Sequence, residues 1–455
     1  MMNREILRLA LPSIIANITV PIVGMVDIAV AGHLDVGAAT CIGGISIGSM
    51  LFDLLYWNFG FLRAGTGGLT AQAFGRGDMR ECARSLCRGV GLALLIATAI
   101  LAIQIPFTRL AFLVVDCTPE VRGYALEYFF IRVWAAPATL SLMTFRGWFV
   151  GMQDTVSSMW TDFIVNGVNI AGSVILALGI GRWGGLGFSG VALGTVLAQY
   201  SGLAYAVGVT AVRYRRVFSG FTTDEARSSF TGSEMRGFFS MNIDLFMRSL
   251  GFILIYIGFT TISARFGDIM LASSAIMMKL LMIFSYFTDG FAYAGQALAG
   301  RFIGAGDAAS LRSCVREIFI WSMAVAAAFM LIYWTSGVPM LRVMTSDVQV
   351  IDACRQFIPW LILMPPLGCA AFTWDGIYEG ATASKAMRNA MLASAACFFF
   401  AWTAGKNILD STTVETGTER YRALAIHILL GAYFMHLLVR TVWLTLSYKK
   451  SIKIN

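Results

Sequence analysis

Acidic side chains are rare inside long apolar runs, and Asp27 lies deep within the first such run of this sequence. It follows Pro21 by six residues, and a proline inside a helix leaves the carbonyl four residues earlier, here that of Asn17, without its helical hydrogen bond. An ionised Asp at the centre of a bilayer costs about 2.5–3.5 kcal/mol, so it usually marks a pathway, a relay or an ion pair. We predict that Asp27 holds an exchangeable proton or a small cation. The alternative is a structural Asp that caps a loop near His33.

A second polar feature lies in the apolar window near 157–180. Its polar residues recur at steps of four, four, three and four: Ser158, Asp162, Asn166, Asn169 and Ser173. In a helix these positions fall within a stripe of about 80°, so one polar face follows an otherwise apolar helix. That face must point into the bundle or into a wet cavity. We predict that it lines a cavity, and the alternative is that it hydrogen-bonds neighbouring helices.

Four further residues are candidates for the same cavity. Thr195 and Gln199 are one helical turn apart in the window near 185–211, although the preceding Gly190-x-x-x-Gly194 equally suggests plain helix packing. Asn17 is exposed to the cavity through the Pro21 break, and Met25 offers a soft, adaptable wall to a substrate.

The second half of the chain carries its own intramembrane charges. Asp244 and Arg248 are spaced i, i+4, which lets them neutralise each other. Lys279 has no local partner, so it either meets an acid on another helix, Asp244 being the obvious one, or lies in water. Asp289 is expected near a helix end or a gating surface.

The amino-acid composition indicates whether these apolar segments lie in water or in lipid. Of 455 residues, 57% are apolar and only 13% are charged, with a mean hydropathy of +0.71. A soluble domain carries about 25% charged residues, so lipid must cover most of this chain. The net charge is +8, and the basic residues lie in short segments between the apolar runs. This distribution indicates membrane topology and not nucleic-acid binding. The eight scattered cysteines and three histidines show no metal-ligand spacing, and no metal site is expected.

The apolar windows predict an all-α polytopic membrane protein, since a spanning helix needs roughly 20 mostly apolar residues. About twelve such windows lie near residues 6–32, 38–62, 89–113, 124–150, 157–180, 185–211, 238–263, 269–297, 316–338, 351–378, 387–409 and 422–447. The longest polar gap divides them into a six-helix lobe at 1–211, a cytoplasmic linker at 212–237 and a second six-helix lobe at 238–455. Lys and Arg are more frequent in the loops that share a side with the two termini, so both termini are predicted to be cytoplasmic.

An internal repeat supports the division into two lobes. Three short motifs recur at one offset of about 229 residues, from Gly75–Asp78 to Gly304–Asp307, from Pro137 to Pro366, and from Gly147-x-x-x-Gly151 to Gly376-x-x-x-Gly380. Six helices per repeat keep the same orientation, so the two lobes should be related by a pseudo-twofold axis along the membrane normal.

The motifs also resemble a known family. The pattern from Leu11-Pro12 through Val26-Asp27 to Gly32-His33-Leu34, the run Asp289–Gln296 and the run Trp374–Thr382 are similar to those of the MATE (multidrug and toxic compound extrusion) family, most closely its DinF-like branch. The resemblance covers nearly the whole chain. It implies two six-helix lobes, a central cleft and export of amphipathic compounds driven by a proton or sodium gradient.

Two positions depart from the family pattern. Asp35 replaces a glycine in a loop, which is expected to be harmless. Ser173 stands where the fifth-span pattern Asn-x-x-x-Asp has its carboxylate, so a coupling scheme that requires this second acid is in doubt.

We therefore predict a secondary active antiporter of the inner membrane that exports cationic or amphipathic small molecules in exchange for protons or sodium ions. No cofactor other than the coupling ion is expected. The predicted partners are the substrate and membrane lipids; no nucleic acid is expected, and the protein is predicted to be a monomer. The chain has no Gly-x-x-x-x-Gly-Lys-[Ser/Thr] phosphate loop, which argues against direct use of ATP. One alternative is a flippase of lipid-linked sugars, for which Arg132 and Lys279 are the strong cationic candidates. The other is a membrane-embedded enzyme.

Overall fold

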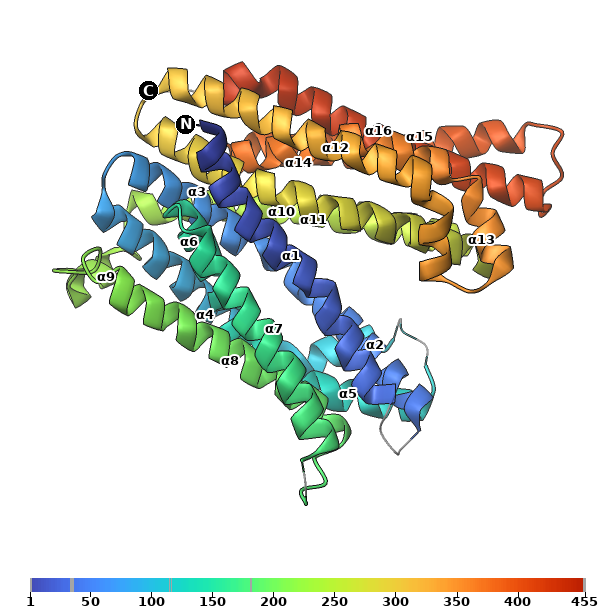
Figure 1. The fold of residues 1–455 in the computed structure, drawn as a ribbon, viewed down its shortest axis with the longest axis horizontal. Helices are drawn as coiled ribbons and strands as arrows, with labels where there is room; N and C mark the ends of the chain where they lie inside the picture. Colours follow the sequence, from blue (N-terminus) through green and yellow to red (C-terminus); the bar gives the residue numbers. More distant parts are fainter. Residues whose placement is uncertain (1, 33–36, 114, 116, 181, 453–455) are drawn as a thin grey trace. The chain divides into compact units, whose positions relative to one another are not determined.

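The computed structural model describes residues 2–32, 37–113, 115, 117–180 and 182–452, and within them every regular element is helical (Figure 1). The prediction of an all-α chain is confirmed. The α-helices are α1 (Met2–Gly32), α2 (Ala38–Tyr56), α3 (Phe61–Gly75), α4 (Met79–Ala111), α5 (Pro119–Arg132), α6 (Ala136–Gly151), α7 (Thr155–Leu178), α8 (Phe188–Arg213), α9 (Thr223–Ser228), α10 (Ser233–Ala264), α11 (Asp268–Gly304), α12 (Ala308–Met344), α13 (Val348–Arg355), α14 (Ile358–Gly380), α15 (Ser384–Asp410) and α16 (Glu419–Ser451), with 3₁₀ turns η1 (Trp57–Gly60) and η2 (Val133–Ala135).

Most predicted spans are present as long apolar helices. In the described residues, 10 helical segments are long and apolar enough to cross a membrane, and α13 with α14, bent by 58°, makes 11. The predicted span near 124–150 is present as two shorter helices, because the 3₁₀ turn η2 separates α5 from α6, which have 14 and 16 residues. Pro137 lies at the start of α6, where its missing N–H is tolerated.

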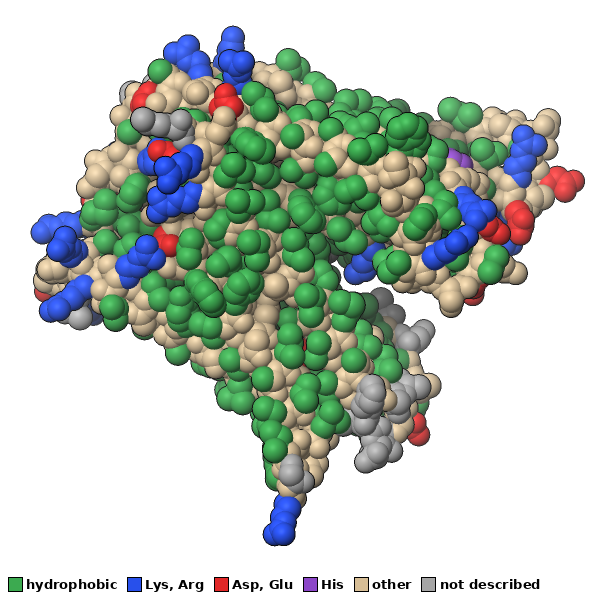
Figure 2. Space-filling view, viewed as in Figure 1, with side chains coloured by type: hydrophobic (Ala, Val, Ile, Leu, Met, Phe, Trp, Pro, Cys, Tyr) green, Lys and Arg blue, Asp and Glu red, His purple; other side chains and the backbone are tan. Residues whose placement is uncertain are grey.

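The outer faces of these helices remain apolar. Hydrophobic side chains cover much of the visible surface, while Lys and Arg gather toward helix ends (Figure 2). Trp334 and Leu446, for example, are strongly exposed although each lies on a long helix. Water would not favour this arrangement over so large an area, whereas a lipid bilayer solvates it without cost.

Contacts group the chain into two compact units. The N-terminal unit consists of Leu11–Ser240, and the C-terminal unit consists of Met1–Ala10 together with Met241–Asn455. The start of α1 is held in the C-terminal unit by an ion pair between Glu5 and Arg301 at 2.7 Å and by a hydrogen bond of 3.1 Å from Trp321 Nε1 to Asn3 Oδ1. Helix α1 therefore contributes residues to both units.

The polar segment that follows α8 folds onto the N-terminal unit. It contains the short helix α9, which begins with a capping box between Thr222 and Glu225. Arg88 of α4 donates from Nε to the carbonyl of Ser229 at 3.0 Å and pairs with Glu81 at 2.6 Å. The segment is thus fixed to α4 by a buried hydrogen bond.

Equivalent residues of the sequence repeat make equivalent structures. Asp78 and Asp307 cap the N-termini of α4 and α12, accepting hydrogen bonds from the amides of Glu81 and Ser310 at 2.9 Å. The hydroxyl and amide of Ser310 lower the pKa of the half-buried Asp307 carboxyl, because both groups favour its ionised form.

The glycines of the repeat lie where two helices cross closely. A Cβ atom at Gly147 would overlap the carbonyl of Arg63 on α3, and one at Gly376 would overlap the carbonyl of Ala292 on α11. Because these neighbours are backbone atoms, only separation of the helices could relieve the overlap. The α3–α6 and α11–α14 crossings therefore require glycine.

Gly376→Ala should lower the free energy of unfolding by about 1–3 kcal/mol, the usual cost of overpacking. Gly167→Ala on α7 is the matched control, because a Cβ there meets nothing within 4 Å and alanine favours the helix. Thermal unfolding of the purified variants in detergent measures both. Equal melting temperatures for the two variants would refute the steric argument.

Candidate functional site

Asp27 lies on the second half of α1, which continues as one helix through Pro12 and Pro21. Its side chain is only 7% exposed and accepts a hydrogen bond of 2.9 Å from the Ser173 hydroxyl of α7. Pro21 has no N–H to donate to the carbonyl of Asn17 one turn earlier, which weakens the helix between the two residues. The buried Asp27 carboxylate thus projects from a locally weakened helix and accepts a hydrogen bond from a neutral hydroxyl.

The polar face predicted on α7 makes contacts with both neighbouring helices. Asn166 Nδ2 donates to Thr19 Oγ1 of α1 at 2.6 Å. Asn169 Nδ2 donates to Thr195 Oγ1 of α8 at 2.9 Å. With the bond from Ser173 to Asp27, three polar residues of α7 join α1 and α8, so the face forms interhelical hydrogen bonds as its alternative interpretation expected.

Small residues allow α7 and α8 to pack side by side (Figure 1). A Cβ atom at Gly172 would lie 3.1 Å from the Cα of Gly194, and one at Gly194 would lie 2.5 Å from the amide nitrogen of Ser173. This close approach brings Thr195 within reach of Asn169. The glycine pattern of α8 therefore packs the helices and also positions the polar groups.

Two amide oxygens at this site have unused hydrogen-bonding capacity. Among the described residues, Asn169 Oδ1 and Gln199 Oε1 are buried and find no hydrogen-bond partner. Buried polar atoms are nearly always satisfied by protein or by water. Water, an ion or a polar substrate group is therefore expected against them.

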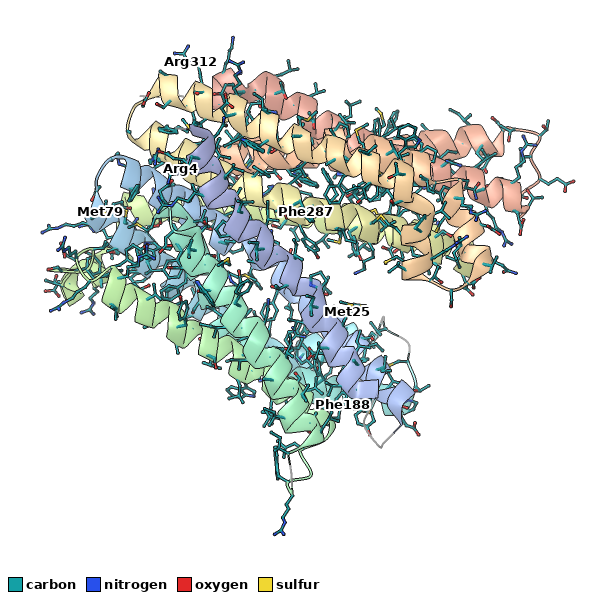
Figure 3. The ribbon with its side chains drawn as sticks, viewed as in Figure 1. Arg4, Met25, Met79, Phe188, Phe287 and Arg312 are labelled. Atoms are coloured by element: carbon teal, nitrogen blue, oxygen red, sulfur yellow. The ribbon has the colours of Figure 1, made fainter. Side chains whose placement is uncertain are left out.

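Asp162 of the predicted polar face is held by an ion pair, whereas the other two predicted cavity residues, Met25 and Asn17, lie on α1. Asp162 pairs with Arg146 of α6 at 2.5 Å, so its charge is neutralised away from Asp27. Met25 projects from α1 and is 61% exposed (Figure 3). Asn17 is half-buried on the same helix. Within the residues that the structure describes, the polar cluster around Asp27 consists of Asp27, Asn166, Asn169, Ser173 and Thr195. Gln199 lies one turn further along α8.

Arg132 adds a positive charge that acts electrostatically on Asp27. It lies at the end of α5, donates to the Tyr128 hydroxyl at 2.9 Å and stacks over the Phe52 ring at 4.8 Å. From the sequence, Arg132 is expected only as one of the two cationic candidates for the flippase alternative. No spacing in the sequence connects it to Asp27, because the two residues lie on different helices.

In the C-terminal unit, the predicted pairing of Asp244 with Arg248 is wrong. Asp244 pairs with Arg388 of α15 at 2.5 Å and accepts a hydrogen bond from Ser384 at 2.9 Å. Arg248 pairs with Asp375 at 2.5 Å and Glu379 at 3.0 Å, both on α14. The i, i+4 spacing permitted a local pair, but charges on adjacent helices outcompete it.

Arg440 of α16 completes a buried charge network that was not predicted from the sequence. Its side chain is 1% exposed, pairs with Asp375 and stacks over Phe252 at 4.5 Å. Asp289 acts on Arg440 electrostatically. The only signal in the sequence was an arginine deep in the last apolar window, which alone does not identify its partner.

Lys279 does not pair with Asp244, the acidic partner named for it from the sequence. The expected partner Asp244 is held by Arg388, and within the described residues Lys279 forms no ion pair. Its exposed side chain borders a small pocket of about 80 Å³ together with Met278 and Met282. The motif residues His33, Leu34 and Asp35, and Lys453 of the basic tail, lie outside the described residues.

Comparison with protein families identifies the chain. The MatE family model matches residues 12–175 and 245–401, which include Asp27 and the polar face of α7. The chain belongs to the MatE family. It is 33% identical to DNA damage-inducible protein F of Escherichia coli over 396 residues, which cover 87% of this chain and 84% of that protein. It is 23% identical to a probable multidrug resistance protein NorM of Thermotoga maritima over 360 residues, or 78% and 74% of the two chains.

Solved structures show the same fold. A MOP-superfamily transporter from Pyrococcus furiosus aligns with a TM-score of 0.83 at 16% identity, covering 99% of this chain and 97% of that chain. An outward-facing multidrug resistance MATE transporter aligns with a TM-score of 0.82, also at 16% identity and with the same coverage. The predicted fold class of an all-α polytopic membrane protein and the prediction of a transporter instead of an enzyme are confirmed.

The intramembrane carboxylates of this MatE transporter differ in how their charges are compensated. Asp27 accepts a hydrogen bond from the Ser173 hydroxyl. By contrast, each of four other carboxylates pairs directly with an arginine: Asp162, Asp244, Asp375 and Glu379. A carboxylate held by arginine gains little from binding a further cation. Asp27 is therefore the better candidate for exchange.

Proposed function

We propose that this MatE transporter is a secondary active antiporter that exports cationic or amphipathic small molecules in exchange for protons or sodium ions. The observation that carries the proposal is the buried Asp27 carboxylate, which has the neutral Ser173 hydroxyl as its hydrogen-bond donor. The similarity to a protein described as a probable multidrug resistance protein supports the substrate class.

The exchange would act through the charge of Asp27. When ionised, the carboxylate accepts from Ser173 and attracts a cation or a cationic substrate. Protonation, or binding of a sodium ion by carboxylate and hydroxyl oxygens, cancels that charge and removes the attraction. Because Pro21 weakens α1 at the preceding turns, the change in charge can be relieved by bending this helix.

The proposal is tested in sealed vesicles that contain the purified transporter and a fluorescent lipophilic cation. A pH gradient and a sodium gradient are imposed in separate experiments, and accumulation against the concentration gradient is measured. We expect one of the two gradients to drive accumulation. Failure of both, with efficient movement of a fluorescent lipid between leaflets, would instead indicate a flippase.

Asn169→Ala should lower the transport rate without moving its pH optimum, because the amide donates a hydrogen bond to Thr195 but does not titrate. Asn407→Ala on the exposed side of α15 is the control, and its rate should equal that of the wild type. The rates are measured in vesicles across a series of pH values. A displaced optimum for Asn169→Ala would connect this residue to the proton step.

We also propose that the transporter lies in the inner membrane as a monomer with both termini in the cytoplasm, that its partners are the substrate and membrane lipids, and that it binds no nucleic acid. The positive-inside distribution of Lys and Arg supports this orientation.

Cysteine labelling tests the orientation, but native Cys82 is unsuitable because it is fully buried. An impermeant thiol reagent applied outside intact cells should label Thr412→Cys, between α15 and α16, and should not label Ser228→Cys on α9. The wild-type chain is the background control. The reverse pattern would invert the topology.

A further inference from the structure

A pocket of about 570 Å³ opens at the C-terminal end of α8, away from Asp27. Residues of α4, α6, α8 and the segment that follows α8 line it, and they include Leu86, Phe145, Val207, Arg215, Phe218 and Ser219. We propose that this pocket binds one anionic phospholipid, with the headgroup at Arg215 and an acyl chain along Phe145 and Val207.

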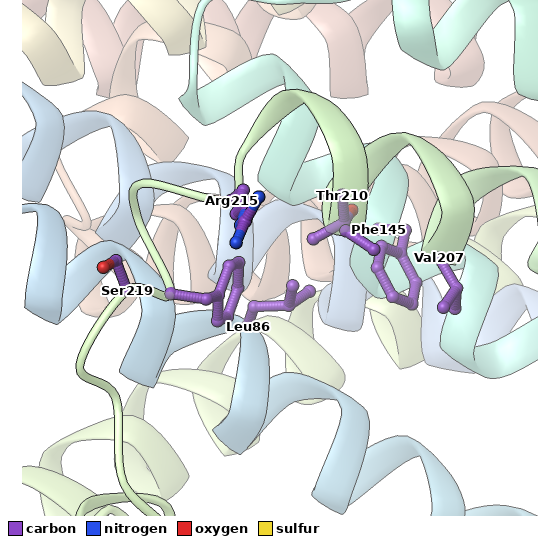
Figure 4. A pocket seen from close by; sticks show the side chains of 8 residues that line it. Leu86, Phe145, Val207, Thr210, Arg215 and Ser219 are labelled. Atoms are coloured by element: carbon purple, nitrogen blue, oxygen red, sulfur yellow. The ribbon is translucent and has the colours of Figure 1, made fainter.

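The lining is divided into a polar and an apolar end. Arg215 and Ser219 lie toward one end, Phe145 and Val207 lie toward the other, and Leu86 lies between them (Figure 4). Val207 lies roughly 9 Å along the axis of α8 from Arg213, where the helix ends, and Arg215 follows in the next turn. A phospholipid has the same order of groups, with a charged headgroup followed by an apolar chain.

The charge at the polar end is uncompensated. Arg213 pairs with Asp154 at 2.9 Å, whereas Arg215 is exposed and forms no ion pair with any residue in the described ranges. Its guanidinium can bind a phosphate in a bidentate manner, and the Ser219 hydroxyl can donate a further hydrogen bond. The polar end therefore favours an anion.

The apolar end distinguishes a lipid from a free phosphate or a soluble metabolite. Val207 is 48% exposed on the surface of a helix long and apolar enough to span the membrane, so in a bilayer the apolar end of the pocket would face acyl chains. A soluble anion would gain nothing from Phe145 and Val207. Basic pockets between transmembrane helices at the cytoplasmic face commonly hold anionic lipid headgroups.

Lipid binding would also fix the segment after α8. Phe218 and Ser219 of this segment form one wall of the pocket, and the same segment continues into α9, which Arg88 holds from α4. A bound lipid would thus stabilise the connection that leads out of the N-terminal unit.

The test uses the purified full-length transporter in detergent, with phosphatidylglycerol and phosphatidylcholine of identical acyl chains added in equal amounts. Native mass spectrometry counts the retained lipids. We expect one phosphatidylglycerol to be preferred by the wild type. Arg215→Gln should weaken its retention about fivefold, since one basic residue near an anionic lipid contributes about that factor.

Two further variants make the result specific. Arg216→Gln removes the neighbouring exposed arginine, which does not line the pocket, and should retain lipid as the wild type does. Val207→Trp fills the apolar end and should reduce retention while Arg215 is intact. Equal retention of the two lipids by the wild type, or equal losses in Arg215→Gln and Arg216→Gln, would overturn the proposal. Inorganic phosphate that displaces the lipid completely at millimolar concentration would assign the pocket to a free anion instead.

Discussion

Asp27→Asn is expected to abolish concentrative efflux and to leave the protein folded. Asparagine has the shape of the protonated carboxyl, and its Oδ1 can still accept the hydrogen bond from Ser173. The variant is fixed in a neutral state, so binding and release of the driving ion can no longer alternate. Accumulation in vesicles under an imposed gradient should fall to the level of protein-free vesicles, while downhill movement of substrate can continue.

The control for this variant is Asp224→Asn on α9, which removes an exposed carboxylate that lies outside the membrane-spanning helices. Its efflux should equal that of the wild type. Size-exclusion profiles and melting temperatures of both variants show whether folding is preserved. Near wild-type accumulation by Asp27→Asn would move the coupling site elsewhere, with Asp289 and Lys279 of α11 as the next groups to test.

Asp375→Asn should lower the free energy of unfolding by about 3–5 kcal/mol, because it removes the carboxylate that pairs with the buried Arg440. Asp375 pairs with both Arg248 and Arg440, and Arg440 is almost inaccessible to solvent. Thermal and denaturant unfolding in detergent measure the loss. The effect should exceed that of Gly376→Ala.

A matched control and a double variant separate charge from packing. Asp352 also pairs with an arginine, Arg355 at 3.4 Å, but both side chains are exposed, so Asp352→Asn should cost less than about 1 kcal/mol. Replacing Asp375 and Arg440 together by leucine should recover part of the stability, because no uncompensated charge of that pair remains. A double variant less stable than Asp375→Asn would show that the pair itself stabilises the unit.

The polar cluster of the N-terminal unit could largely be predicted because its residues follow rules that a single helix obeys. A fixed angular step places Asn166, Asn169 and Ser173 on one face, and the cost of a charge in lipid singles out Asp27. The contact between Ser173 and Asp27 joins residues 146 positions apart, however, and no local rule specifies which helices become neighbours.

The C-terminal unit shows where such rules fail. Asp244 has an arginine one turn away on its own helix but binds Arg388, 144 residues further along the chain. The i, i+4 spacing identifies only partners on the same helix. The partner that Asp244 actually binds depends on the packing of α10 against α15. The break of the fourth predicted span at η2 likewise depends on local backbone geometry, which hydropathy does not report.

The contacts of the N-terminus have a consequence for the order of assembly during synthesis. Glu5 and Asn3 belong to the C-terminal unit, yet their partners Arg301 and Trp321 follow them by 296 and 318 residues. The ribosome must therefore translate the whole N-terminal unit before the first turns of α1 can meet the helices that hold them. Until then the N-terminus has no native partner there, and its capture by α11 and α12 would be a late event in biogenesis.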